Sequence, residues 1–353
     1  MTNSIFKKLS TLDRYLPLWI ALAMSSGVLL SYFVPNLDQT LEAIKLDTVS
    51  LPIAIGLLVM MYPPLAKVRY GKLGEFLANW KLFQVSLFLN WVLGPILMTA
   101  LAWLFLPNEH EFRNGLILVG LARCIAMVLI WNTLACGSAE VAAILVALNS
   151  LFQILAYSFY GWFFMTLLPS WFGLEGAVVN ITIWAIAKSV LIFLGIPFAL
   201  GFLSRLFLTH WFGEEWYEKK FLPAISPLAL VGLLYTIVLL FAMQGEKMLH
   251  QPLAVLKIAL PLVLYFVLMF SLALWLAYKT KHTYEESAAI AFTASGNNFE
   301  LAIAVAIGTF GINSGEALAA TVGPLIEVPT LVALVYLSLW TQKFFQPQPT
   351  NSK

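Results

Sequence analysis

The sequence predicts an all-α polytopic membrane protein, and three observations support that fold class. Of its 353 residues, 61% are hydrophobic and only 11% are charged, whereas a soluble domain carries about 25% charged residues. The mean hydropathy is +0.86. The apolar residues form runs of spanning length, separated by short polar or Pro/Gly-marked breaks such as VPNLDQ and LPNEHEF. We therefore expect residues 1–353 to form a single transmembrane domain.

Ten apolar runs are long enough to cross a bilayer as helices, which takes about 20 residues each. They lie at about 15–34, 47–66, 82–106, 114–136, 139–168, 180–208, 222–243, 252–278, 284–311 and 316–342. An even number of spans places both ends of the chain on the same side of the membrane. No cleavage site of small residues follows the first run, so that run predicts a retained span rather than a signal peptide.

The distribution of Lys and Arg predicts the orientation of these spans. Most of the basic residues lie in the N-terminal tail, in the connections that share its side and at the C-terminal end. The opposite side has only Lys45, Arg113, Lys247 and Lys257. Cytoplasmic loops carry the excess of positive charge in membrane proteins. Both termini are therefore expected in the cytoplasm, and the protein is expected to be integral to the plasma membrane (the cell inner membrane).

The ten spans divide into two halves of five, residues 15–168 and 180–342. Because five is an odd number, a duplicated second half enters the membrane with inverted topology. A shift of 176 residues aligns the string IGLL at 55–58 with VGLL at 231–234. We therefore expect a 5+5 inverted repeat.

The same shift aligns unusual positions of the fourth and ninth spans. It places Gly120 on Gly296 and Cys124 on Glu300. Glycine is common in membrane helices, so its match alone carries little weight. The alignment of Cys124 with Glu300, two residues that are unusual within apolar spans, is harder to explain by chance. The fourth and ninth spans are therefore expected to be partners across the repeat.

The ninth span holds residues that do not favour a continuous helix. Ser295, Gly296, Asn297 and Asn298 are poor helix formers, and three of them have side chains that form local hydrogen bonds. Irregular backbone at bilayer depth persists only where it lines a cavity or is buried in protein. Discontinuous helices at matched positions of two inverted halves indicate a transport site. We expect a break here and a matching break near 119–122, at Gly120.

Glu300 follows this cluster within the membrane. A carboxylate at bilayer depth is costly unless it is paired, hydrated or protonated, and such groups are functional by default. Glu300 is therefore a candidate for exchanging a proton in each transport cycle. The alternative is a structural ion pair with Arg123 or Lys188. Glu327, in the string GPLIEVP, is a second intramembrane carboxylate that either lines the path or holds helices together.

Cys124 is a candidate ligand. A buried cysteine alone usually behaves as a small hydrophobic residue, but a cation at Arg123 stabilises the thiolate, which is the form that binds soft metals. A thiolate selects thiophilic ions over hard ones. Cys136 lies at the end of the fourth span, where simple packing is the better interpretation.

Several function classes are excluded by what the sequence lacks. It contains no GxxxxGK[ST] string and no Gly-rich loop after a strand, which excludes primary active transport by this chain alone unless a separate ATPase supplies it. A separate ATPase is not expected to be required. The formal net charge of +2 does not suggest nucleic acid. Two cysteines are too few for a structural zinc site, and the four histidines lie in predicted loops. No cofactor is expected.

Three strings resemble those of a known family: ARCIAMVLIWNTLACG at 122–137, FTASGNNFELAIAVAIG at 292–308 and VGPLIEVPTLVALVYLSLW at 322–340. They are similar to the signatures of the ten-helix arsenite permease family, within the superfamily that includes bile-acid/sodium symporters, and the resemblance runs along nearly the whole chain. It implies a ten-helix inverted repeat in which helices four and nine are discontinuous and cross each other. It also implies export of arsenite, sometimes antimonite, driven by the proton gradient.

The resemblance places the essential cysteine of the family at Cys124 and its essential carboxylate at Glu300. Family members often carry acidic residues where this chain has Thr133 and Ser138. The expected partners are arsenite or antimonite, protons and the lipid bilayer, and arsenic is expected as transported substrate on Cys124. The residues expected at the substrate and coupling sites are Cys124, Arg123, Asn297, Asn298, Glu300 and Glu327.

Two other function classes remain open at this point. One is a sodium-coupled organic-anion symporter of the same fold, with Asn297 and Asn298 among the sodium ligands and Cys124 in a packing role. The other is a membrane receptor, which needs a soluble output domain. Only 13 residues follow Trp340, too few for such a domain.

Overall fold

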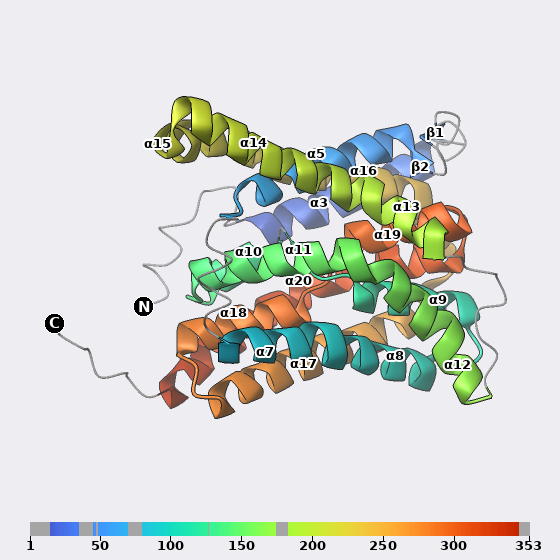
Figure 1. Cartoon of the computed structure of the whole chain (residues 1–353). Helices are drawn as coiled ribbons and strands as arrows, with labels where there is room; N and C mark the ends of the chain where they lie inside the picture. The colour runs from blue at the N-terminus through green and yellow to red at the C-terminus, as the bar shows by residue number, and fades with distance from the viewer. Residues whose placement is uncertain are drawn as a thin grey trace.

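The computed structural model describes residues 15–34, 45–46, 49–69, 80–125, 127–173 and 183–345. These residues form long apolar helices that lie side by side (Figure 1). Six of the described helices are long and apolar enough to cross a membrane: Trp80–Phe105, Ala139–Trp171, Ile183–Phe212, Glu214–Gly245, Pro252–Lys279 and Gly315–Phe344. Three shorter apolar helices accompany them, at Leu18–Phe33, Leu51–Ala66 and Phe299–Phe310. The chain is an integral helical membrane protein.

The first part of the chain contains one short pair of strands and a series of helices. They are α3 (Leu16–Phe33), β1 (Lys45–Leu46), β2 (Val49–Ser50), α5 (Leu51–Ala66), α7 (Trp80–Phe88), η2 (Leu89–Leu93), α8 (Gly94–Phe105), α9 (His110–Leu121), α10 (Met127–Leu134), α11 (Ala139–Trp162), η3 (Phe163–Leu167) and α12 (Leu168–Trp171). The strands β1 and β2 pair antiparallel. The span predicted to start near residue 47 therefore begins as this hairpin and becomes helical at Leu51.

The second part of the chain contains α13 (Ile183–Val190), η4 (Leu191–Gly195), α14 (Ile196–Phe212), α15 (Glu214–Trp216), η5 (Tyr217–Phe221), α16 (Leu222–His250), α17 (Pro252–Lys279), α18 (Tyr284–Ser295), α19 (Phe299–Phe310), α20 (Gly315–Thr341) and η6 (Gln342–Phe344). The junction predicted between the two halves is residues 169–179, of which 174–179 lie outside the described residues.

Each π-helical segment in the described chain precedes a proline. The segments η2, η3, η4 and η5 end two residues before Pro95, Pro169, Pro197 and Pro223 respectively. Proline has no N–H and its ring clashes with the carbonyl four residues earlier, so the preceding turn widens. The carbonyl of Trp91, four residues before Pro95, instead accepts a hydrogen bond from the Tyr160 hydroxyl at 2.9 Å. The carbonyl that the proline leaves without an intrahelical donor is thus hydrogen-bonded by a neighbouring helix.

The helices form two groups. In one group, α16 packs along both α3 and α5, and α14 packs on α5. In the other, α17 and α20 pack with α8, α9, α18 and α19. Figure 1 shows α3, α5, α14 and α16 in the upper part of the view and α7, α8, α17 and α18 in the lower part. The contacts of α13 with α11 and α19 join the two groups.

Close helix approach in the first group depends on small residues. A Cβ added to Gly232 of α16 would lie 2.8 Å from the backbone nitrogen of Met60 in α5. A Cβ added to Gly27 of α3 would lie 2.5 Å from the carbonyl oxygen of Val238. Membrane helices associate through such small-residue contacts because lipid offers no hydrophobic driving force.

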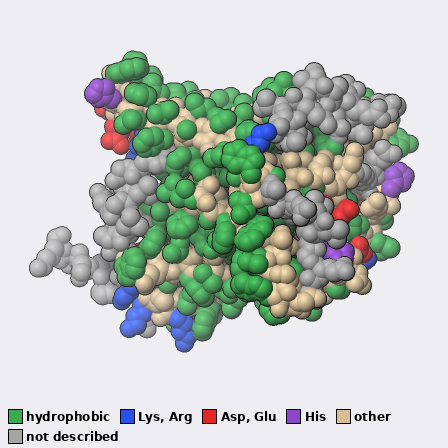
Figure 2. Space-filling model, turned by 45° about the vertical axis from the view of Figure 1, so that its right-hand side comes forward, with side chains coloured by type: hydrophobic (Ala, Val, Ile, Leu, Met, Phe, Trp, Pro, Cys, Tyr) green, Lys and Arg blue, Asp and Glu red, His purple; other side chains and the backbone are tan. Residues whose placement is uncertain are grey.

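The surface between the helix ends is apolar, as a bilayer requires. Large side chains are widely exposed there, including Leu104 at 71%, Leu155 at 73% and Leu253 at 74%. In Figure 2 hydrophobic side chains cover the middle of the visible face, and most of the visible charged side chains lie toward its left and right edges. A contiguous apolar belt around the helices fits a lipid environment.

Candidate functional site

The fourth and ninth predicted spans are each two helices separated by a non-helical segment. The ninth is broken where its sequence predicts: α18 ends at Ser295 and α19 begins at Phe299. Gly296 adopts an extended conformation (φ −72°, ψ 143°). Asn298 caps α19, because its side-chain oxygen accepts a hydrogen bond from the Leu301 amide at 3.0 Å. Ser295 remains in α18, with its hydroxyl bonded to the Ala291 carbonyl at 2.8 Å.

The break in the fourth span begins at Ala122, the last residue of the expected range 119–122, rather than at Gly120. Gly120 is still helical, and α9 continues to Leu121 before the chain becomes extended at Ala122. Gly120 instead packs against Met98 of α8, because an added Cβ would lie 2.3 Å from that side chain. The break therefore contains Arg123 and Cys124 themselves, and the helix resumes as α10 at Met127.

The two breaks cross and share backbone hydrogen bonds. Arg123 and Asn297 form an antiparallel bridge. The Cys124 amide donates to the Gly296 carbonyl at 3.2 Å, and the Asn298 amide donates to the Ala122 carbonyl at 3.0 Å. Two discontinuous helices thus satisfy each other's backbone at a point shielded from lipid, which is where irregular backbone is tolerated.

Asn297 stabilises the end of α9. Its side-chain amide donates to the carbonyls of Val119 at 2.8 Å and Ala122 at 3.1 Å. Both carbonyls lie at the C-terminal end of α9, where the Val119 carbonyl also accepts from the Ala122 amide at 3.1 Å. Its side-chain oxygen Oδ1 is buried and has no hydrogen-bond partner.

Cys124 lies at the crossing, 3% exposed. Its thiol receives backbone hydrogen bonds from Met127 and Val128, the first residues of α10. A Cβ added to Gly296 would lie 3.1 Å from the Cys124 Cβ and 3.7 Å from Glu327 Oε1. Cys124 and the Glu327 carboxylate therefore both lie next to Gly296.

Arg123, expected from the sequence to stabilise this thiolate, points elsewhere. Its Nη1 donates to the Tyr265 hydroxyl at 2.9 Å and to the Ala294 carbonyl at 3.1 Å. A Cβ added to Gly94 would lie 2.8 Å from the same Nη1. The side chain is fully buried, and its Nε and Nη2 have no hydrogen-bond partner. Within the described residues it forms no ion pair with Glu300.

Two carboxylates reach the crossing from different helices. Glu327 of α20 is fully buried, and its Oε1 accepts a hydrogen bond from the Asn297 amide at 3.3 Å. Its Oε2 is buried without a partner. Glu300 lies in the first turn of α19 and is 8% exposed. Both carboxylates lie within electrostatic range of Cys124.

The crossing holds several polar atoms that the protein leaves unsatisfied. They are Asn297 Oδ1, Asn298 Nδ2, Glu327 Oε2 and the Nε and Nη2 of Arg123. Buried polar atoms without partners are rare in native structures and call for an explanation. A small polar ligand at the crossing would supply hydrogen bonds to them.

Three residues that support the site carry weak or no sequence signals. Gln153 of α11 bonds both backbone groups of Arg123, at 2.9 Å and 3.1 Å. It could be found because an amide in an apolar span is unusual. Tyr265 and Gly94, which hold the Arg123 guanidinium, resemble ordinary membrane-helix residues.

Thr133 and Ser138 lie outside the crossing. Thr133 is exposed and its hydroxyl bonds the Leu129 carbonyl at 2.7 Å. Ser138 is the N-cap of α11, where its side chain accepts from the Val141 amide at 3.3 Å. Aspartate caps a helix about as well as serine, so an acidic residue at position 138 would serve the same local role.

Comparisons with known proteins agree with this geometry. The Sodium Bile acid symporter family matches residues 54–251. The chain is 56% identical to Arsenical-resistance protein Acr3 of Corynebacterium glutamicum, over 99% of this chain and 96% of that protein. It is 32% identical to Arsenical-resistance protein Acr3 of Alkaliphilus metalliredigens, over 96% of this chain and 95% of that protein. An uncharacterised transporter of Synechocystis is 36% identical, over 98% of this chain and 92% of that protein. The chain therefore belongs to the arsenite permease family, within the superfamily that also contains the sodium/bile acid symporters.

Proposed function

We propose that this protein is a secondary transporter that exports arsenite, and the related antimonite, from the cytoplasm in exchange for protons. The observation that carries the proposal is the position of Cys124, a buried cysteine at the crossing of two discontinuous helices, next to Gly296 and near Glu327. Two relatives that match almost the whole chain are arsenical-resistance proteins.

The chemistry of arsenite suits a site with one thiol. Near neutral pH arsenite is mostly the uncharged trihydroxide, so its site needs no net charge, but its arsenic is strongly thiophilic. Three thiolates would hold it too tightly to release. One thiolate from Cys124 with oxygen and nitrogen groups around it allows the arsenic–sulfur bond to form and break in each cycle. The unsatisfied Asn297 Oδ1, Asn298 Nδ2 and Glu327 Oε2 are suitable partners for the remaining hydroxyls.

The two carboxylates provide the coupling. A carboxylate at this depth is costly when charged and unpaired. Glu300 can therefore take up and release a proton as the site opens first to one side of the membrane and then to the other. Glu327, like Cys124, lies next to Gly296 and is the second group able to hold that proton.

The same proposal includes a 5+5 inverted repeat over residues 15–168 and 180–342, with both termini in the cytoplasm. Two features support it. The helices α9 and α18, which precede the breaks, are both 12 residues long. Ser138 and Ser314 lie 176 residues apart, and each caps the helix that follows the broken pair, α11 and α20 respectively.

Arsenite uptake into everted membrane vesicles tests the function. We expect uptake to require an imposed proton gradient, to stop when a protonophore collapses it, and to continue when a sodium ionophore removes the sodium gradient. The competing function is a sodium-coupled organic-anion symporter, which the matched family suggests by name. Uptake that follows sodium at constant pH, and that Asn297→Ala shifts to higher sodium concentration, would favour that function instead.

A further inference from the structure

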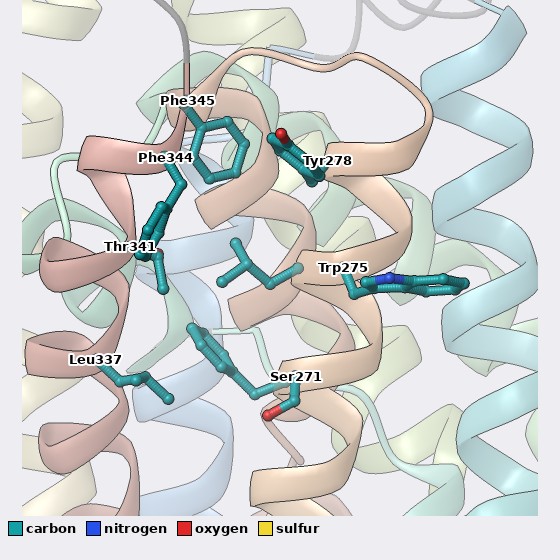
Figure 3. Close-up of a pocket in the computed structure, with 9 residues that line it drawn as sticks. Ser271, Trp275, Tyr278, Leu337, Thr341, Phe344 and Phe345 are labelled. Carbon is teal, nitrogen blue, oxygen red and sulfur yellow. The ribbon is translucent and has the colours of Figure 1, made fainter.

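An apolar groove lies between α17 and α20, far along both helices from the crossing. It has a volume of about 330 Å³, at the lower end of the roughly 300–1,000 Å³ typical of ligand pockets. Figure 3 shows Leu337, Thr341 and Phe344 on one wall and Ser271, Trp275 and Tyr278 on the other. The rings of Tyr278 and Phe345 meet edge to face, 5.3 Å apart, and close one end of the groove.

The groove faces the membrane rather than another helix of the described chain. Trp275 is 57% exposed, and Tyr278, Leu337 and Phe344 are also exposed. Trp and Tyr side chains of this kind gather where the hydrocarbon of a bilayer meets its headgroups. The groove therefore opens toward acyl chains, with its closed end at headgroup depth.

Three lysines surround that closed end. Lys343 lies in η6, and its ammonium is 4.2 Å from the ring centroid of Trp340 and 5.0 Å from that of Phe344, which lines the groove. Lys279 ends α17 directly after Tyr278, and Lys281 follows two residues later. All three are exposed, and none forms an ion pair within the described residues.

The nearest acidic residues along the chain form no ion pair with these lysines in the described part of the chain. Glu285 and Glu286 begin α18, and Glu286 is bonded to the Thr283 amide at 3.0 Å as part of the helix cap. The end of the groove is thus locally positive, whereas the groove itself is apolar. An amphiphile with one negative charge matches both properties.

We propose that this groove is a binding site for an anionic phospholipid, with one acyl chain between α17 and α20 and the phosphate against Lys279, Lys281 and Lys343. Basic residues beside a membrane attract anionic headgroups. The cation–π contacts of Lys343 hold its ammonium near the closed end of the groove. The site is independent of the transported substrate.

Native mass spectrometry of the full chain in detergent tests the site, with added phosphatidylglycerol compared with phosphatidylcholine of the same acyl chains. We expect the wild-type protein to retain phosphatidylglycerol more tightly, by roughly five-fold for each lysine that contributes. The variant K279Q/K343Q is expected to lose most of that preference. The control K219Q/K220Q removes two exposed lysines that follow α15 and is expected to keep it.

A second variant tests the groove separately from the charge. Ser271→Trp fills the space between the two walls and is expected to lower retention of both lipids without changing folding. Equal retention of the two lipids by the wild type would overturn the proposal, as would unchanged preference in K279Q/K343Q. A dimer that Ser271→Trp dissociates would also overturn it, because a second copy would then occupy the groove.

Discussion

The two helix breaks meet at one point but are formed in different ways. The second break is made by its own residues, because Gly296 extends the chain and Asn298 caps the next helix. The first break contains no glycine, proline or asparagine. Its extended residues are held by other elements, through Gln153 of α11 and the backbone of the second break. One break is encoded locally, and the other is imposed by tertiary contacts.

This difference separates the roles of the two segments. The locally encoded break supplies its own extended residue and its own helix cap, in addition to the backbone hydrogen bonds that it shares with the first break. The imposed break carries Cys124 and Arg123, so the position of the thiol depends on residues far away in the sequence. A segment that carries reactive groups and is held from outside can change its contacts when the surrounding helices move.

The largest expected effect comes from Glu300, at the start of the helix that follows the locally encoded break. Glu300→Gln should keep the fold, because the amide fits the same space, but lower proton-driven arsenite uptake in everted vesicles to background, because an amide cannot exchange a proton. Glu316→Gln is the matched control. Glu316 is also a buried glutamate in the first turn of its helix, α20, and its variant should transport normally. If Glu300→Gln retains pH-driven uptake, Glu300 does not couple transport to protons, and Glu327 becomes the candidate for that role.

The second prediction tests whether tertiary contacts impose the first break. Gln153→Leu removes the two hydrogen bonds to the Arg123 backbone and leaves a buried N–H and C=O unbonded, at about 1–3 kcal/mol each. We expect a clear loss of thermal stability in detergent and a loss of transport. Asn149→Leu, four residues earlier on the same helix, removes bonds to Trp91 and Asn90 side chains instead. It should destabilise the protein less. Equal effects of the two variants would show that the first break does not depend on Gln153.

The third and smallest effect is expected at the second break. Asn298→Ala removes the cap of α19, which costs about 1 kcal/mol. Asn298→Ser restores a capping oxygen and should recover most of that stability, as measured by thermal unfolding in detergent. If serine gives no recovery, Asn298 does not act as the cap of α19, and the second break is not stabilised by its own residues.

Sequence reasoning succeeded where the signal is local. The break at Ser295–Asn298 was predictable because poor helix formers are adjacent there. The break at Ala122 was placed early, at Gly120, because no local residue marks it and the shift by symmetry is only approximate. The roles of Tyr265 and Gly94 could not be predicted, since their contacts with Arg123 exist only after α8, α17 and the two breaks pack together. The π-helical turns before four prolines follow from proline chemistry but were not anticipated either.

The central claim is that the Cys124 sulfur binds the arsenic, and arsenite export by Cys124→Ser tests it most directly. Serine keeps the size of the side chain and its ability to accept from Met127 and Val128, but it exchanges a soft ligand for a hard one. Cys136→Ser is the control, because Cys136 lies beyond the other end of α10. We predict that Cys124→Ser reaches the membrane at the wild-type level and exports arsenite only at background, while Cys136→Ser remains active. Export by Cys124→Ser at close to the wild-type rate would contradict thiolate ligation.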